Sequence, residues 1–248
     1  MKVFSVYGIT KSGKTTTIEN IIKELKRRGY SVGSVKEIHY EKFAIDVEGT
    51  NTDRHRKAGS ELVTARGYYE TDIMFQRKLD VDEILQFYHQ DYVVLEGVTD
   101  TEVPKILCAS SPEEIHSKID DTVFAISGVI SNEIKEYGGL PVINAVEDVK
   151  AMADLVEEKV FEKLPNLGDE CCGLCGKTCR QMAVDILKGR AKREDCRVAG
   201  GSVEVTINGR SLVMVPFVQN MIESVIRAMI SQLKGYEKGD ISINVRQK

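Results

Sequence analysis

Two groups of residues in this 248-residue chain have types and spacings that could do chemistry, and the first lies near the N-terminus. Residues 8–15 read GITKSGKT, which fits the pattern G-x-x-x-x-G-K-[ST] at every fixed position. Glycines let such a loop curl until several backbone N–H groups point at phosphate oxygens. We therefore expect a phosphate-binding loop (P-loop). Its candidate nucleotide contacts are Gly8, Thr10, Lys11, Ser12, Gly13, Lys14, Thr15 and Thr16.

Two side chains of this loop suit a magnesium nucleotide. The Lys14 ammonium is expected to reach the β- and γ-phosphates, and the Thr15 hydroxyl is expected to ligate magnesium. Val3 to Tyr7 reads as a short buried strand before the loop, and an amphipathic helix follows the loop until Gly29. Strand, glycine loop and helix in this order are the context that the motif requires. The apolar helix face consists of Ile18, Ile21, Ile22 and Leu25.

A carboxylate further along the chain is placed to complete this site. Residues 91–97 read DYVVLEG, an apolar strand with Asp91 at its start and Glu96 at its end. Parallel strands present functional side chains at their C-terminal edge, so we expect Glu96 to face the phosphates and the magnesium ion. Lys14 and Glu96 are then the candidate catalytic residues, and Asp91 is expected to be structural. The alternative for Glu96 is a solvated acid at a strand end.

The second group is a cluster of thiols. Five cysteines fall between residues 171 and 196, with the spacing C-C-x₂-C-x₃-C-x₁₆-C. A C-x₂-C pair brings two thiolates onto one ion or cluster, and a distant thiolate can close the cage. Zinc and iron–sulfur clusters both accept four thiolates, and thiol redox chemistry is a further alternative. Cys108 stands alone in an apolar stretch, and we expect it to be a buried strand residue without chemistry.

The composition narrows the class of function. A net charge of −4 and a pI near 5.7 argue against a general nucleic-acid binder, which usually carries a basic surplus. No apolar run approaches the roughly 20 residues that span a bilayer, and the first residues lack the features of a signal peptide. We therefore expect a cytoplasmic protein with no membrane partner. In that reducing compartment, clustered thiols are more often metal ligands or redox groups than disulfides.

Strand and helix patterns alternate along the first two-thirds of the chain. This alternation predicts an α/β fold of the P-loop NTPase type, with a mostly parallel sheet flanked by helices. We expect three units: a nucleotide-binding domain over residues 1–166, a cysteine-rich segment over 167–199 and a small α+β tail over 200–248. Further strands are expected at residues 31–35, 61–65, 72–75, 122–127 and 141–144, and a helix at 146–164.

The tail has patterns of its own. Residues 203–207 and 211–215 alternate around Asn208-Gly209, which is a strong hairpin signal. A helix and then a strand from Asp240 to Val245 are expected to follow. We expect the apolar helix stripe to pack on the tail's own sheet, with a homodimer or another partner contact as the alternative. The stripe consists of Val218, Met221, Ile222, Val225, Met229 and Leu233.

Several motifs in one order resemble the molybdopterin-guanine dinucleotide biosynthesis protein B (MobB) family over residues 1–164. The family's G-x-S-G-S-G-K-T-T loop is similar to residues 8–16, and its K-H-x-H-H segment is similar to KEIHY at residues 36–40. Its F-D-x-D-x-x-G-K-D-S and R-x-x-A-G elements are similar to residues 43–52 and 56–59, and its E-G-F-K and P-K-I elements to residues 96–99 and 104–106.

This resemblance implies GTP and magnesium as ligands, together with molybdopterin and a partner guanylyltransferase that joins GMP to it. It also implies that His39 and Asp46 help to hold an anionic pterin phosphate or a metal. The guanine signature N-K-x-D is absent, so spacing alone does not choose GTP over ATP. The chain departs from the family pattern at Glu37 and Tyr40 (histidines), Thr50-Asn51 (Lys-Asp), Thr99 (lysine) and Ser127-Gly128 (an expected aspartate).

A second resemblance covers the cysteines. The stretch from Cys179 to Cys196 fits C-x₃-A-x₂-I-x₂-G-x₆-C and looks like the small 4Fe–4S domain of corrinoid iron–sulfur proteins and electron-transport subunits. That domain normally has four residues before its third cysteine, whereas three are present in this chain. The resemblance implies a 4Fe–4S cluster, with Cys171 as a spare ligand. The implied ligands are Cys172, Cys175, Cys179 and Cys196, and zinc is the alternative metal.

These features together suggest a GTP-binding accessory protein of molybdenum or tungsten cofactor biosynthesis, with slow hydrolysis at most. A client molybdo- or tungsto-enzyme is a further expected partner. The alternative is a nucleotide-driven metallochaperone or a redox-regulated P-loop ATPase. A non-catalytic scaffold would keep the loop without turnover.

Overall fold

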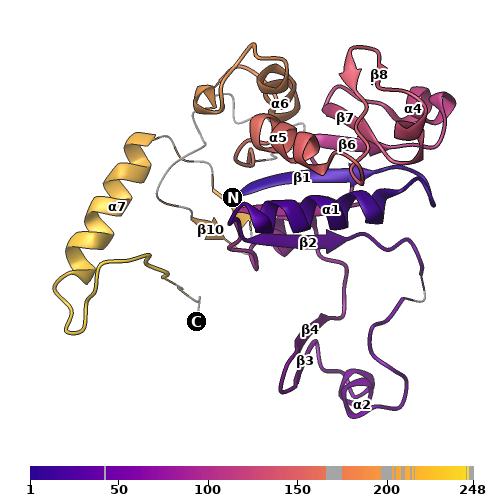
Figure 1. Cartoon of the computed structure of the whole chain (residues 1–248). Helices are drawn as coiled ribbons and strands as arrows, with labels where there is room; N and C mark the ends of the chain where they lie inside the picture. Colours follow the sequence, from indigo (N-terminus) through magenta and orange to yellow (C-terminus); the bar gives the residue numbers. More distant parts are fainter. Residues whose placement is uncertain are drawn as a thin grey trace.

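In the computed structural model, five strands from the first half of the chain form the central sheet (Figure 1). The structure describes residues 1–41, 43–165 and 175–196, and in the tail residues 203, 205–207, 210–212, 214, 216–243 and 245. No helix among these residues is long and apolar enough to cross a membrane. The strand order is β2-β5-β1-β6-β7, and every neighbouring pair is parallel. The strands are β1 (Lys2–Tyr7), β2 (Val32–Lys36), β5 (Tyr92–Glu96), β6 (Lys105–Cys108) and β7 (Val123–Ser127).

Helices cover both faces of this sheet. On one face, α1 (Lys14–Arg27) packs against α5 (Val149–Lys159), and the Arg28 guanidinium joins them by donating to Asp154 and Glu157. On the other face lie α3 (Val81–Leu85) and α4 (Pro112–Lys118), which add Leu85 and Ile115 to the core. The fully buried β1 and β5 strands read as continuous apolar runs because both of their faces are covered. The expected α/β fold is therefore confirmed.

Two of the expected strands do not join this sheet. β3 (Leu62–Arg66) and β4 (Thr71–Phe75) pair with each other as an antiparallel hairpin, and α2 (Asn51–Lys57) packs against β3. Figure 1 shows this unit projecting from the edge of the sheet that carries β2. The prediction of strands was right at both places, and these two strands are the antiparallel exception to the mostly parallel arrangement. The short link at residues 67–70 closes a hairpin and is too short for a parallel crossover.

The region after β7 is less regular than the sequence predicts. The 3₁₀ turn η1 (Val129–Asn132) is followed by the short pair β8 (Glu136–Tyr137) and β9 (Leu140–Pro141). Of the strand expected at residues 141–144, only Val142 forms a parallel bridge, to Ile126. The helix expected at 146–164 is shorter, because α5 ends at Lys159 and Glu162 instead bridges Lys2 of β1.

The C-terminal third carries α6 (Cys179–Leu187), the 3₁₀ turn η2 (Arg193–Asp195), the short pair β10 (Thr206–Ile207) and β11 (Arg210–Ser211), and α7 (Pro216–Ile230). Both expected unit boundaries, near residues 166 and 199, fall outside the described residues. The hairpin is present as two-residue strands, and its Asn208-Gly209 turn also lies outside them. The strand expected at Asp240–Val245 is wrong for residues 240–243 and 245, which form no regular structure.

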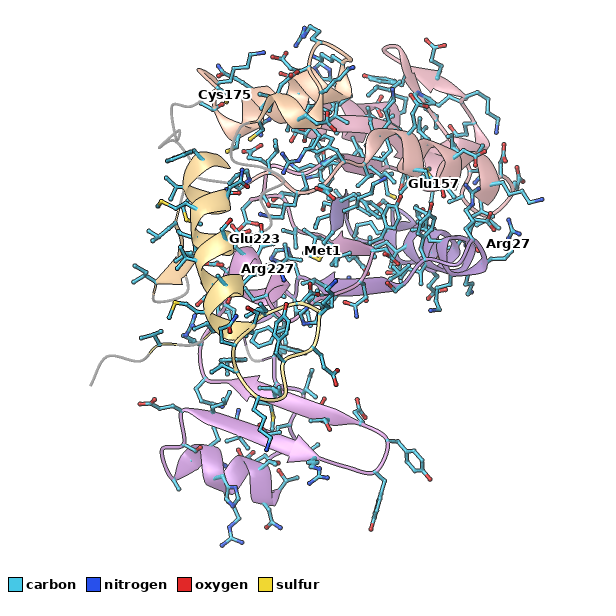
Figure 2. All side chains as sticks on the ribbon, turned by 90° about the vertical axis from the view of Figure 1, so that its left-hand side faces the viewer. Met1, Arg27, Glu157, Cys175, Glu223 and Arg227 are labelled. Atoms are coloured by element: carbon cyan, nitrogen blue, oxygen red, sulfur yellow. The ribbon has the colours of Figure 1, made fainter. Side chains whose placement is uncertain are left out.

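The apolar stripe of α7 is not covered as expected. Met221, Val225, Met229 and Leu233 are each more than half exposed. Figure 1 shows α7 standing apart from the central sheet, and in Figure 2 Glu223 and Arg227 lie next to each other on this helix. The Arg227 Nε donates to Glu223 at 2.7 Å. The prediction that the tail's own sheet covers the stripe is therefore wrong for these four residues, because a sheet of two-residue strands offers little surface.

Candidate functional site

The loop between β1 and α1 has a backbone shape that requires glycine at two places. Gly8 has φ of 149° and Gly13 has φ of 95°, a region that residues with a Cβ rarely adopt. A Cβ at Gly8 would lie 2.0 Å from the Cys108 carbonyl oxygen, and one at Gly13 would lie 3.0 Å from the Gly128 Cα. The loop therefore rests directly on the backbone at the ends of β6 and β7. A side chain at either glycine would push the loop out of this position.

The buried Ser12 holds the loop in place by hydrogen bonds to Ile9 within the loop and to Val129 after β7. Its hydroxyl donates to the Ile9 carbonyl at 2.9 Å, and its own carbonyl accepts from the Val129 N–H at 3.2 Å. Gly128 must be small here, because a Cβ on it would lie 2.1 Å from the Ser12 carbonyl oxygen. The expected aspartate at this place is thus replaced by a residue that packs under the loop.

The remaining loop side chains lie on its outer side. Thr10, Lys11, Thr15 and Thr16 are exposed, and the Lys14 ammonium donates to the Ile9 carbonyl across the loop. Helix α1 begins at Lys14 and has no acidic residue in its first turn. Its free N–H groups and partial positive charge therefore point into the loop, where an anion would be stabilised. The structure brings all the predicted loop residues together in one place.

Glu96 meets this loop as the sequence predicts. The Thr15 Oγ1 donates to Glu96 Oε1 at 3.0 Å, and the Lys36 ammonium donates to the same oxygen. Glu96 is buried, whereas Asp91 at the other end of β5 accepts from both the backbone and the hydroxyl of Ser31. The structural role expected for Asp91 is thus confirmed. The interpretation of Glu96 as a merely solvated acid does not fit its burial.

These residues fit a magnesium nucleotide. The two glycines let the loop curl closely against the ends of β6 and β7, and the helix N-terminus and Lys14 supply positive charge for phosphates. Thr15 and Glu96 bring a hydroxyl and a carboxylate oxygen to one point, and oxygen ligands are those that magnesium prefers. The arrangement supports phosphate binding and phosphoryl chemistry, and by itself it does not specify a base.

Three described cysteines of the predicted cluster lie in the α6 region of the chain. Cys179 and Cys196 are buried and Cys175 is half-buried, and Cys175 and Cys196 pack with Phe161 and Leu164, which follow α5, in one small apolar core. Figure 2 shows Cys175 on the segment that carries α6. The predicted ligand Cys172 and the spare Cys171 lie outside the described residues. Among the residues that are described, no group of three potential ligands is close enough to hold a metal ion.

Arg193 lies within this core. Its Nε and Nη2 donate to the carbonyl oxygens of Glu162 and Lys163, and its Nη1 is buried without a partner among the described residues. Burial lowers the pKa of Arg193, while the neighbouring Cys196 and Cys179 thiols act in the opposite direction. A guanidinium nitrogen without an acceptor is therefore buried near the thiols.

Comparison with known proteins decides the family. The family model described as "Molybdopterin guanine dinucleotide synthesis protein B" matches residues 3–129, which is about half of the chain and includes the loop and Glu96. The chain belongs to the MobB family. The chain is similar to a Methanocaldococcus jannaschii protein named as a putative molybdopterin-guanine dinucleotide biosynthesis adapter protein. The two are 29% identical over 246 residues, which cover 96% of this chain and 94% of that protein.

Other relatives match a smaller share of the chain. A Bacillus subtilis protein named as a probable adapter of the same pathway is 28% identical over 59% of this chain and 87% of its own length. The crystal structure of Bacillus subtilis MobB superposes with a TM-score of 0.54 at 25% identity, and covers 66% of this chain and all of that chain. That structure leaves about a third of this chain uncovered, whereas the M. jannaschii protein covers 96% of it.

The MobB resemblance implies that His39 and Asp46 help to hold a ligand, and neither makes a hydrogen bond to the phosphate-binding loop among the described residues. His39 is exposed after the end of β2. Asp46 is half-buried before α2, where its Oδ1 accepts from the Thr50 and Thr52 hydroxyls at 2.8 and 2.9 Å. The Thr50 hydrogen bond, followed by the others, holds the pKa of Asp46 below its usual value. No hydrogen bond joins either residue to the loop within the described residues, and their ligand role remains a prediction.

Lys36 is the residue that the sequence interpretation missed. It appeared only as the first letter of a MobB-like motif and was given no role. The only signal in the sequence was its position directly after the strand expected at residues 31–35. In the structure, Lys36 and Glu96 are register partners in the parallel pair of β2 and β5.

Proposed function

We propose that this MobB-family protein binds GTP with magnesium and acts as an accessory protein in molybdenum or tungsten cofactor biosynthesis. The observation that carries the proposal is the Thr15–Glu96 hydrogen bond at the start of α1, beside a loop shaped for phosphate. Guanine is inferred from the family, because relatives from M. jannaschii and B. subtilis are named molybdopterin-guanine dinucleotide biosynthesis adapter proteins.

At this site the chain's own residues bind and orient the nucleotide. The loop amides and Lys14 neutralise phosphate charge, and Thr15 and Glu96 supply oxygen ligands for magnesium. The ion, when bound, neutralises charge that develops on the β- and γ-phosphates. We infer slow hydrolysis at most, because the Glu96 carboxylate, which accepts from the Thr15 hydroxyl, is assigned to the metal ion and is then not free to activate water.

The inferred partners follow from the same role. They are molybdopterin, the guanylyltransferase that joins GMP to it, and a client molybdo- or tungsto-enzyme, all in the cytoplasm. The test is reconstitution of guanine dinucleotide formation from molybdopterin, magnesium, GTP and the guanylyltransferase. Adding the wild-type chain should raise the yield, whereas Lys14→Ala should not. An equal yield without the chain would contradict the proposal.

We infer that the cysteine segment, residues 167–199, holds a 4Fe–4S cluster on Cys172, Cys175, Cys179 and Cys196, with zinc as the alternative. The support is the cysteine spacing together with the core that Cys196 and Cys175 share. The unpartnered Arg193 Nη1 also fits, because a cluster held by thiolates would offer it a sulfur acceptor. The inferred use of the cluster is as a redox or assembly sensor, or as a docking element for a client enzyme.

One observation favours a second candidate, a nucleotide-driven metallochaperone or a redox-regulated ATPase. Arg193 fastens the cysteine segment to the Glu162–Lys163 backbone, and Glu162 bridges Lys2 on the strand that leads into the loop. Contacts of Arg193 and Glu162 therefore run from the cysteine segment to the strand that precedes the loop. Nucleotide preference separates the candidates: tighter binding of GTP favours cofactor biosynthesis, and tighter binding of ATP favours the second candidate.

A further inference from the structure

Lys36 and Glu96 face each other at the C-terminal edge of the sheet. They end the adjacent parallel strands β2 and β5 in register, so both side chains emerge beside the phosphate loop. The Lys36 ammonium and the Thr15 hydroxyl donate to one oxygen, Glu96 Oε1. The Lys36 side chain is 54% exposed and that of Glu96 is 11% exposed. A half-exposed cation therefore lies one hydrogen bond from the oxygens that suit magnesium.

The position of this cation relative to the phosphates follows from the chemistry of such loops. A loop threonine of this kind would hold magnesium at the β- and γ-phosphates. A cation bound to the carboxylate next to Thr15 would therefore lie within reach of these two phosphates. The three donors of the ammonium on a flexible four-carbon stem can turn from Glu96 to a nearby phosphate oxygen without backbone movement.

We propose that Lys36 is a second binding cation, besides Lys14, that contacts the γ-phosphate and makes the site prefer a nucleoside triphosphate to a diphosphate. When magnesium and a triphosphate bind, the Lys36 ammonium leaves Glu96 Oε1 for a γ-phosphate oxygen, and the carboxylate oxygen becomes free for the metal. In this exchange the Glu96 carboxylate gains the metal ion in place of the ammonium, and the ammonium pairs with the γ-phosphate. The inference rests on the proposed nucleotide binding.

A purely structural role for Lys36 predicts something different. If Lys36 only neutralised Glu96, its loss would affect triphosphate and diphosphate alike, since both need the same loop and metal oxygens. Only a contact with the γ-phosphate changes the ratio of the two affinities. The ratio is therefore the quantity to measure.

The test is calorimetric titration of the full chain with magnesium and either GDP or the non-hydrolysable analogue guanosine 5′-[β,γ-imido]triphosphate. Wild type should bind the triphosphate analogue more tightly. Lys36→Met should lower the triphosphate-to-diphosphate affinity ratio about tenfold, the loss expected for one charge-assisted hydrogen bond. Lys36→Arg should restore much of the ratio. The matched control is Lys78→Met, because Lys78 is an exposed lysine that pairs with the adjacent Glu37 at 2.7 Å.

The outcomes separate this inference from the proposed function. An unchanged ratio in Lys36→Met, or an equal loss of both affinities, would overturn the role of Lys36 and leave nucleotide binding standing. The same ratio change in Lys78→Met would also overturn it, as an effect of general charge. Wild type that binds neither nucleotide would overturn the proposed function and this inference with it.

Discussion

The Thr15 hydroxyl and the Glu96 carboxylate meet at 3.0 Å, although 81 positions separate them in the chain. The contact exists because β5 is the parallel neighbour of β1, so the end of one strand lies beside the loop that follows the other. The site is therefore a direct product of the strand order.

The Thr15–Glu96 pair should act through magnesium. Thr15→Ala removes one oxygen ligand, and we expect it to weaken the dependence of nucleotide binding on magnesium. Glu96→Gln keeps the size of the side chain but loses the charge, so nucleotide binding should be near normal and hydrolysis reduced. Titrations with and without magnesium, together with a phosphate-release assay, measure both effects. Hydrolysis in Glu96→Gln equal to that of wild type would show that Glu96 does not serve the metal.

Gly8→Ala should damage both stability and binding. The new Cβ would lie 2.0 Å from the Cys108 carbonyl at a φ of 149°, so the loop or the end of β6 must move. We expect a loss of about 3 kcal/mol in the free energy of unfolding, with nucleotide affinity much reduced. Gly239→Ala is the control, because nothing lies within 4 Å of a Cβ there. Urea denaturation that shows equal stability for the two variants would contradict the loop geometry.

Acid should loosen the α2 unit through Asp53. The Gly49 N–H, and then Lys57 and Arg56, hydrogen-bond this buried carboxylate and hold its pKa well below the usual value. Because the folded-state pKa is the lower one, the stabilisation is present above the unfolded value of about 4 and is lost as the pH falls below it.

Hydrogen exchange of residues 49–58, measured as a function of pH, tests this expectation. In wild type, protection should decline as the pH falls below about 4. In Asp53→Asn these residues should already be poorly protected at neutral pH, and their protection should change less between neutral and acidic pH. If protection in Asp53→Asn still fell steeply at acidic pH, another group would be responsible for the pH dependence.

The cysteine variants should divide by ligand role. Cys172→Ser, Cys175→Ser, Cys179→Ser and Cys196→Ser should each lose most iron and the absorbance near about 400 nm, because a 4Fe–4S cluster needs four ligands. Cys171→Ser should keep most of both, and all five variants should still bind nucleotide. Iron and zinc counts after anaerobic purification provide the measurement. Stoichiometric zinc without iron in wild type would contradict the cluster, and iron loss in Cys171→Ser but not in Cys172→Ser would move the ligand set by one residue.

The loop was predictable from sequence because its determinants are local. Gly8, Gly13 and Lys14 stand at fixed spacing between an apolar strand and an amphipathic helix, and no distant residue is needed to recognise them. Glu96 was also predictable, since an acid at the end of an apolar strand can be placed at the sheet edge from parallel topology alone. Cys108 is buried in β6, as its apolar neighbours predict.

The rest depended on pairing that single strands do not encode. The β3 and β4 patterns predict strands but not that they pair only with each other, away from the sheet. Lys36 gains its meaning from its register with Glu96, which depends on β2 lying beside β5. The apolar face of α7 predicts a helix that needs a partner, but amphipathicity alone does not name what covers it.

The measurement that tests the central claim most directly is titration of magnesium-GTP and magnesium-ATP into the wild-type chain and into Lys14→Ala. Lys14 belongs to the loop motif and is the first residue of α1. The Lys14→Ala substitution deletes a flexible cation for the β- and γ-phosphates and leaves the loop glycines intact. The account predicts saturable binding to wild type that is tighter for GTP than for ATP, and severe weakening in Lys14→Ala. Equal GTP affinity in wild type and Lys14→Ala, or no GTP binding to wild type, would contradict it.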